Sequence, residues 1–231
     1  MGNLSEFLME ELNVATAFTI PIFGGIEVAE STVISWVIMA IIVILTLVLT
    51  RNMRVEKPGK LQVGVEYAVT ALQNLVRGII GHEGERYVPY LSTVLVFLGI
   101  SNIFAIFGMK PPTKDLNVTA ALALMSICLI EYAGIHARGG VGFLKSLAAP
   151  TPIMAPMNVL EVAIRPTSLC MRLFGNVLGA FVIMELIKLV VPVFVPAIFS
   201  LYFDLFDGLI QTYVFVFLTS LFMKETMGDE E

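Results

Sequence analysis

Charged residues are scarce in this sequence. Asp, Glu, Lys and Arg together make up 14% of its 231 residues, whereas hydrophobic residues make up 57%. Soluble domains contain about 25% charged residues, so this composition excludes an ordinary water-soluble protein and predicts one that crosses a membrane several times. No polar stretch is long enough for a separate soluble domain, and no internal repeat is evident. We therefore expect residues 1–231 to form a single integral membrane domain.

A basic excess, a cysteine framework and a nucleotide-binding loop are also missing. The 19 acidic residues outnumber the 14 basic ones, and the resulting net charge of -5 argues against a nucleic-acid partner. Cys128 and Cys170 both lie in apolar segments, where cysteine usually packs as a small side chain, so we expect neither a disulfide nor a metal site there. No GxxxxGKS or GxxxxGKT motif occurs, so we expect no nucleotide site and no cofactor.

Long apolar runs predict where the chain crosses the bilayer, because a spanning helix needs about 20 mostly apolar residues. The first such run, residues 32–50, carries no charge and is followed by basic residues. The positive-inside rule then places the N-terminal segment, residues 1–31, outside and the next loop in the cytoplasm. The basic residues after the run are Arg51, Arg54, Lys57 and Lys60.

The remaining segments predict an all-α integral membrane protein. Residues 59–81 interleave polar and apolar side chains at helical spacing, which favours an interfacial amphipathic helix; an ordinary packed helix is the alternative. Residues 88–109 and 116–137 are predicted to be transmembrane helices. Residues 158–191 would form a helix about 50 Å long, well beyond the hydrocarbon core. We therefore expect it to form a strongly tilted hairpin with residues 197–223, which leaves the C-terminus in the cytoplasm.

Ionisable residues inside the predicted spans are the candidates for function, because hydrocarbon makes them costly. Glu131 and His136 lie late in their span, where such side chains usually reach the headgroups, so we favour that role over a role in transport. Glu161 and Arg165 are four residues apart and can form a structural ion pair. Arg172 has no carboxylate three or four residues away on its own helix. It therefore needs a partner from elsewhere or a water-filled cleft.

Arg172 belongs to a polar stripe on the predicted helix 158–191. At 100° per residue, the stripe occupies about a quarter of the helix circumference. Its members are Glu161, Arg165, Ser168, Arg172, Asn176 and Gly179. Asp204, Asp207 and Gln211 cluster likewise on the final helix, while Glu185 and Lys188 could form a structural pair. An intramembrane ion pathway is the most specific hypothesis for this collection of residues.

Four ordered motifs resemble those of subunit a of F-type rotary ATP synthases, and together they cover essentially the whole chain. They are KPGKLQVGVEYAV, KDLNVTAALAL, RPTSLCMRLFGN followed by VLGA, and FDGLIQTYVFVFLTSLFM. The resemblance implies a non-catalytic stator subunit that lies against a ring of small proteolipid hairpin subunits and forms two offset half-channels for H⁺ or Na⁺. It also implies a peripheral-stalk membrane subunit as a partner, an indirectly coupled soluble catalytic sector, and a multi-pass location in a bacterial plasma membrane.

The same resemblance implies roles for individual residues. Arg172 falls at the family's essential arginine, Gln211 at the glutamine of the final helix, and Asn176 at the asparagine that follows the glycine. Many members also carry an acid nine residues after the arginine and a histidine seven residues before the glutamine. This chain has Phe181 and Asp204 at those two positions.

The departure at Phe181 leaves the outer half-channel with several candidate residues. Glu185, one helical turn after Phe181, could replace the missing acid, or Asp204 could serve alone. Asp115 and Asp207 are further candidates. The sequence does not distinguish H⁺ from Na⁺ as the transported ion, because in this family the ring binds the ion.

Two other functions are compatible with the residues alone. A secondary transporter would use Arg172 to bind an anionic solute at the bilayer midplane; it predicts internal pseudo-symmetry, which we do not find in the sequence. A purely structural membrane subunit would hold Arg172 in a buried ion pair and would tolerate lysine at that position.

Overall fold

The computed structural model describes most of the chain, and its regular secondary structure is helical apart from one short hairpin. The described residues are 16–21, 26–51, 53–54, 58–104, 111–147, 153, 155–190, 199 and 201–228. Strands β1 (Thr16–Ile20) and β2 (Ile26–Ala29) pair antiparallel, and α2 begins directly after β2. The helical elements are α2 (Glu30–Thr50), α3 (Lys60–Ile80), η1 (Glu85–Tyr87), α4 (Val88–Ile103), η3 (Pro112–Lys114), α5 (Leu116–Leu147), α6 (Ala155–Val190), η5 (Leu201–Asp207) and α8 (Gly208–Met227).

Within the described part of the chain, four helices are long and apolar enough to cross a membrane. They cover Glu30–Thr50, Leu116–Phe143, Ala155–Lys188 and Leu205–Met227. This confirms the predicted class, an all-α integral membrane protein. Helix α4 is shorter, at 16 residues. The last residues of the span predicted for 88–109, residues 105–109, lie outside the described part of the chain.

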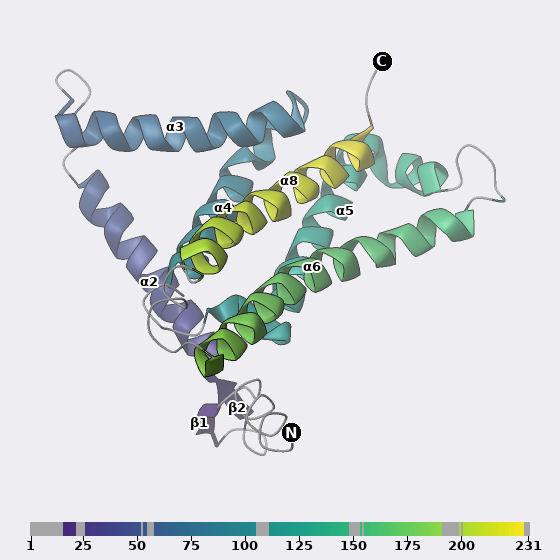
Figure 1. Ribbon diagram of the computed structural model, residues 1–231. Coiled ribbons are helices and arrows are strands. Elements are labelled where there is room, and N and C mark those ends of the chain that lie inside the picture. The colour runs from purple at the N-terminus through teal and green to yellow at the C-terminus, as the bar shows by residue number, and fades with distance from the viewer. Residues whose placement is uncertain are drawn as a thin grey trace, which may run out of the picture.

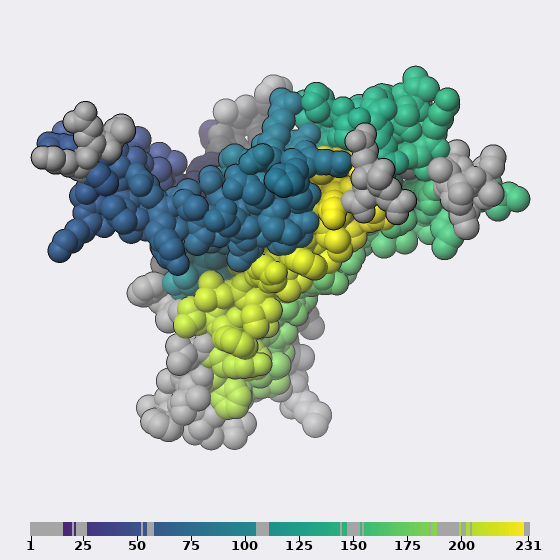
Figure 2. Space-filling view, turned by 90° about the horizontal axis from the view of Figure 1, so that it is seen from above, coloured from purple at the N-terminus to yellow at the C-terminus, as the bar shows by residue number. Residues whose placement is uncertain are grey.

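Helix α8 is the centre of the molecule. It packs against α3, α4, α5 and α6, and Figure 2 shows it lying beside α3 with α6 on its other side. Its buried residues recur every three or four positions, so they form one face. Several are serine or threonine, and the hydroxyls of Thr219 and Ser220 each donate a hydrogen bond to the carbonyl four residues earlier. This internal bonding allows small polar side chains to be buried between helices.

The main core lies where α8 meets its neighbours. Phe215, Val216 and Met223 of α8 are almost fully buried and belong to one apolar cluster with residues of α3, α4 and α5. Helix α3 lies crosswise at one end of this core (Figure 1). Only the C-terminal half of α3 contributes buried residues, Val76 and Ile80, so its N-terminal half projects beyond the bundle.

Helices α2 and α6 lie at the edges of the molecule. The buried residues of α2 are confined to its first half, namely Ser31, Ile34, Ser35 and Ile38. Its second half diverges from α4 (Figure 1) and is largely exposed. Helix α6 packs against α5 and α8 and runs alongside α8, oblique to α4 (Figure 1).

Several local features differ from the sequence prediction. Helix α5 continues past residue 137 to Leu147, but its axis bends at Gly139, whose φ of 72° is a left-handed conformation that glycine adopts at little cost. The final helix opens with a π-helical segment, η5, where a continuous α-helix was predicted. The β1–β2 hairpin was not predicted at all. The turn expected at residues 191–196 lies outside the described residues.

Candidate functional site

Arg172 lies on the exposed side of α6. Leu169, three residues before it, and Leu173, the next residue, are buried, whereas Arg172, Gly175 and Asn176 are exposed. Arg172 makes no hydrogen bond or ion pair with any residue that the structure describes. A guanidinium on a membrane-spanning helix is costly unless an anion or water meets it. This side chain is therefore positioned for a partner from outside the described chain.

Asn176 and Gln211 connect α6 to α8 one turn beyond Arg172. The Asn176 Nδ2 donates a hydrogen bond of 2.8 Å to the Gln211 Oε1. Gln211 is only 3% exposed, and among the described residues its Nε2 has no acceptor. A buried amide that lacks a partner usually bonds to water or to a group that arrives from outside. Because the Gln211 Oε1 accepts the bond from Asn176, the Nε2 is the end of the amide that remains available.

A second polar group lies beside the N-terminal end of α8. The Asn102 Nδ2 donates to the Gly208 carbonyl at 2.8 Å and to the Thr212 hydroxyl at 3.0 Å, and its Oδ1 accepts from the Thr113 hydroxyl at 3.2 Å. Gly208 is required for this approach, because a Cβ there would lie 2.9 Å from the Asn102 Cβ. Sequence reasoning did not select Asn102, although it is a polar residue inside an apolar run and so carried a usable signal.

Asp115 is buried and caps α5. Its Oδ1 accepts a hydrogen bond from the Asn117 backbone at 2.9 Å, as an N-cap residue does, and its Oδ2 accepts one from the Ser31 hydroxyl at 2.5 Å. Asp115 is 4% exposed, and both of its carboxylate oxygens accept hydrogen bonds from within the protein. The residue thus joins the starts of α2 and α5.

Phe181 stands where many proteins of the resembled family carry an acid, and the ammonium group of Lys114 lies over its ring. The Lys114 Nζ lies 3.3 Å from the centroid of the Phe181 ring, which is a cation–π contact. Asp207 is partly exposed at the end of η5. The side chains of Glu185 and Asp204 lie outside the described part of the structure.

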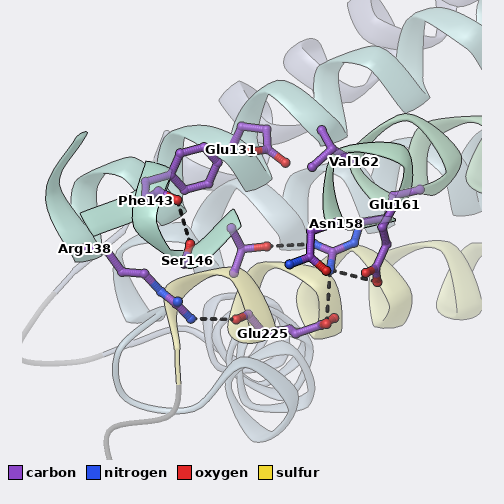
Figure 3. A pocket seen from close by; sticks show the side chains of 10 residues that line it. Glu131, Arg138, Phe143, Ser146, Asn158, Glu161, Val162 and Glu225 are labelled. Carbon is purple, nitrogen blue, oxygen red and sulfur yellow. Dashed lines mark hydrogen bonds and ion pairs between the residues drawn. The ribbon is translucent and has the colours of Figure 1, made fainter. Parts of the chain in front are cut away.

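A polar pocket of about 190 Å³ opens near the C-terminal end of α8, between α5, α6 and α8 (Figure 3). The Glu161 carboxylate lies 3.2 Å from the Arg165 guanidinium, the spacing expected from the sequence. Glu225 is a second carboxylate partner at 3.1 Å, and the Thr226 hydroxyl accepts a hydrogen bond of 2.9 Å from the same guanidinium. Glu131 also lines the pocket, and its Oε1 has no partner among the described side chains.

Arg138 closes one side of the pocket by capping α8. Its Nε donates to the Met227 carbonyl at 3.1 Å and its Nη2 to the Glu225 carbonyl at 3.2 Å. Gly228 follows with a φ of 88°, and a Cβ there would lie 2.6 Å from the Arg138 Nη2. The end of α8 therefore uses an arginine from α5 to satisfy carbonyls that have no partner within the helix. Within the described ranges, no three His, Cys, Asp or Glu side chains are grouped so as to hold a metal ion.

Comparison with known proteins identifies the family. A family model described as "ATP synthase A chain" matches residues 32–224. "ATP synthase subunit a, sodium ion specific" of Propionigenium modestum is 32% identical over 90% of this chain and 77% of its own length. "ATP synthase subunit a" of Moorella thermoacetica is 34% identical over 85% of this chain and 89% of its own length. "ATP synthase subunit a 1" of Crocosphaera subtropica is 32% identical over 88% and 89%, respectively. The chain therefore belongs to the ATP synthase subunit a family.

Proposed function

We propose that this chain is the ion-translocating stator subunit of a rotary F-type ATP synthase. It lies against a ring of small proteolipid hairpin subunits, and H⁺ or Na⁺ flow through two offset half-channels turns the ring for ATP synthesis, or the reverse. The observation that carries the proposal is Arg172, a guanidinium without a described partner on the exposed side of a membrane-spanning helix. Family membership supports the same function and does not favour the secondary-transporter alternative.

Arg172 supplies the charge that an ion-carrying carboxylate needs. Each ring carboxylate is neutral while it faces lipid, because it holds a proton or a cation, and it becomes anionic when it releases that ion at the stator. An arginine suits this role because it stays protonated and is weakly hydrated, so it can meet the anion without relaying a proton itself. Its fixed positive charge also blocks a cation from passing directly between the half-channels.

Asn176 and Gln211 assist at the same point. The buried Gln211 Nε2 can donate a hydrogen bond to the ring carboxylate or to a water molecule beside it, since the Asn176 bond occupies the other end of the amide. A donor with fixed orientation costs little to reorganise when an anion arrives. Asn176 is thus a positioning residue for Gln211, and Gln211 donates to the reacting carboxylate directly or through water.

The polar groups at the two ends of α8 suit access routes from opposite sides. Asn102 and Thr113 lie beside the N-terminal end of α8, while the pocket with Glu131 and Arg165 opens near its C-terminal end. We assign the first group to the outer route, together with Asp115, and the pocket to the inner route. Moving one elementary charge across the membrane releases about 2.3 kcal/mol for each 100 mV of membrane potential. Rotation of the ring delivers this energy to the soluble catalytic sector.

Either Glu185 or Asp204 serves the outer route in place of the missing family acid, and Asp207 is a further carboxylate near it. Asp115 contributes charge there, although its oxygens are hydrogen-bonded within the protein. Glu161 and Arg165 remain a structural ion pair at the rim of the inner pocket. The chain resides in a bacterial plasma membrane with its N-terminus outside, and a peripheral-stalk membrane subunit anchors it against the turning ring.

Replacement of Arg172 by alanine tests this function in the reconstituted complex. We expect Arg172→Ala to reduce ATP-driven ion pumping to background, measured with pH-sensitive and Na⁺-sensitive dyes in the same vesicles. ATP hydrolysis by the detached soluble sector should be unchanged. Arg51→Ala, which removes an exposed arginine at the end of α2, is the matched control and should pump normally. Normal pumping by Arg172→Ala would exclude the proposed role.

A further inference from the structure

A small cluster of polar residues connects η1 to the later part of α5. Arg86 in η1 and His136 late in α5 are 50 residues apart in sequence, yet the Arg86 Nη1 lies 3.2 Å from the His136 Nε2. The Tyr132 ring stacks on the His136 ring, with centroids 6.0 Å apart and planes inclined by 9°. All three side chains are exposed. We call Arg86, Tyr132 and His136 the Arg86 cluster.

The Arg86 cluster carries a positive charge that no described carboxylate balances by an ion pair. A guanidinium only donates hydrogen bonds, so the His136 Nε2 is the acceptor in this contact. The neighbouring Arg77 is balanced by Glu85 at 2.9 Å. Arg86 forms no ion pair with any carboxylate in the described ranges. Its contact with His136 uses one of five N–H donors, which leaves the others free for a planar, bidentate acceptor such as a phosphate.

An apolar surface on α5 continues from the cluster toward the middle of the bilayer. Leu124, Cys128 and Tyr132 follow one another at intervals of four residues and are all exposed. Ile135, close to His136, is also exposed. His136 lies 20 residues after the start of the candidate span Leu116–Phe143, and about 20 residues cross the hydrocarbon core, so we expect its side chain at the depth of the lipid headgroups. The surface therefore combines a cation and an aromatic ring at headgroup depth with apolar side chains below them.

We propose that the Arg86 cluster binds the phosphate of an anionic phospholipid whose acyl chains lie along the Leu124–Cys128 side of α5. An anionic headgroup balances the charge of Arg86, and the bound lipid bridges η1 and the later part of α5, which the Arg86–His136 hydrogen bond also connects. A basic site between membrane helices at the headgroup level is a recognised setting for this class of lipid. The proposal requires only that α5 spans the membrane, so it stands apart from the proposed role of Arg172.

Photolabelling of the assembled complex in nanodiscs tests the lipid site. The probe is phosphatidylglycerol with a photoreactive group on its acyl chain near the headgroup, and the readout is labelled peptides of this chain. We expect labelling around residues 124–136. Unlabelled phosphatidylglycerol should compete, whereas phosphatidylcholine with the same acyl chains should not. Displacement of the probe by inorganic phosphate alone, or equal competition by phosphatidylcholine, would overturn the proposal.

Arg86→Gln gives the matching genetic test. Loss of one cation at the membrane surface should weaken competition by phosphatidylglycerol about fivefold. Arg54→Gln is the matched control, because Arg54 is also exposed but its hydrogen bonds with Gln62 use only its backbone. This control should behave like the wild type. Undiminished phosphatidylglycerol binding in Arg86→Gln contradicts the proposal, and if this variant does not assemble, the lipid competition in the wild-type complex decides the question alone.

Discussion

Two arginines on α6, seven residues apart, meet their surroundings in opposite ways. Arg165 is 9% exposed and contacts Glu161, Glu225 and Thr226, whereas Arg172 has no described partner. Seven residues correspond to almost two full helical turns, so both side chains leave α6 in nearly the same direction. The difference comes from α8, whose C-terminal end covers Arg165 but leaves Arg172 exposed. Arg165 holds the two helices together, and Arg172 remains available to another subunit.

Replacement of Arg165 should therefore destabilise the fold itself. We expect Arg165→Gln to lower the free energy of unfolding by about 2 kcal/mol, because it removes charged hydrogen bonds to two carboxylates and a hydroxyl at a buried position. The loss is no larger because both carboxylates are partly solvated. Arg77→Gln is the matched control. It breaks the exposed Arg77–Glu85 pair and should cost less than about 1 kcal/mol. Thermal unfolding of the purified variants in detergent measures both, and equal losses would refute this role for Arg165.

At the residue scale, spacing predicted some contacts and missed others. The Glu161–Arg165 pair follows from an interval of four residues on one helix, and the structure has it. The Asn176–Gln211 bond and the contact of Arg165 with Glu225 connect separate helices, so no interval in the sequence could reveal them. The contact between Lys114 and Phe181 is of the same kind.

At the scale of elements, α8 is held by close contacts at both ends. Gly208 allows Asn102 of α4 to approach one end, and Gly134 of α5 allows the backbone of Thr226 to approach the other. Small residues at such crossings bring membrane helices together, since packing and hydrogen bonds replace the hydrophobic effect there. The polar groups assigned to the two access routes lie beside these crossings.

Enlargement of Gly134 should separate α5 from α8. A Cβ at this position would lie 2.3 Å from the Thr226 Cγ2 and 3.3 Å from the Thr226 carbonyl oxygen. We therefore expect Gly134→Ala to lower the free energy of unfolding by about 1–3 kcal/mol. In Gly78→Ala, the control on α3, the added Cβ meets nothing within 4 Å. Thermal unfolding should show a loss for Gly134→Ala only. A stable Gly134→Ala variant would mean that the α5–α8 crossing tolerates a wider separation.

The helices themselves were accessible from the sequence because long apolar runs and helical periodicity are local properties. The bend at Gly139 and the π-helical segment η5 were not, although each is also local. A glycine in a helix can be accommodated or can break the axis, and the neighbouring packing decides between these outcomes. In α5, the bend follows directly after Arg138, which is fixed by its bonds to the end of α8.

At the scale of the whole molecule, α8 buries one face against four other helices, and α6 lies at the edge. This arrangement places Arg172 on an outer surface with exposed apolar neighbours on the same helix, Ile164 and Met171 among them. A surface of this composition suits contact with the apolar helices of a ring. The sequence predicted two long paired helices, but it could not show which of them would be covered, because that depends on how α4 and α5 pack around α8.

The central claim is that the exposed side of α6 faces the ring, and site-specific photocrosslinking tests it most directly. Benzoylphenylalanine in place of Met171, which is 59% exposed and adjacent to Arg172, is compared with the same residue in place of Met125, which is 52% exposed on α5. We predict that the adduct from position 171 contains the small ring subunit and that the adduct from position 125 does not. A ring adduct from position 125 alone, or from neither position, would contradict the account.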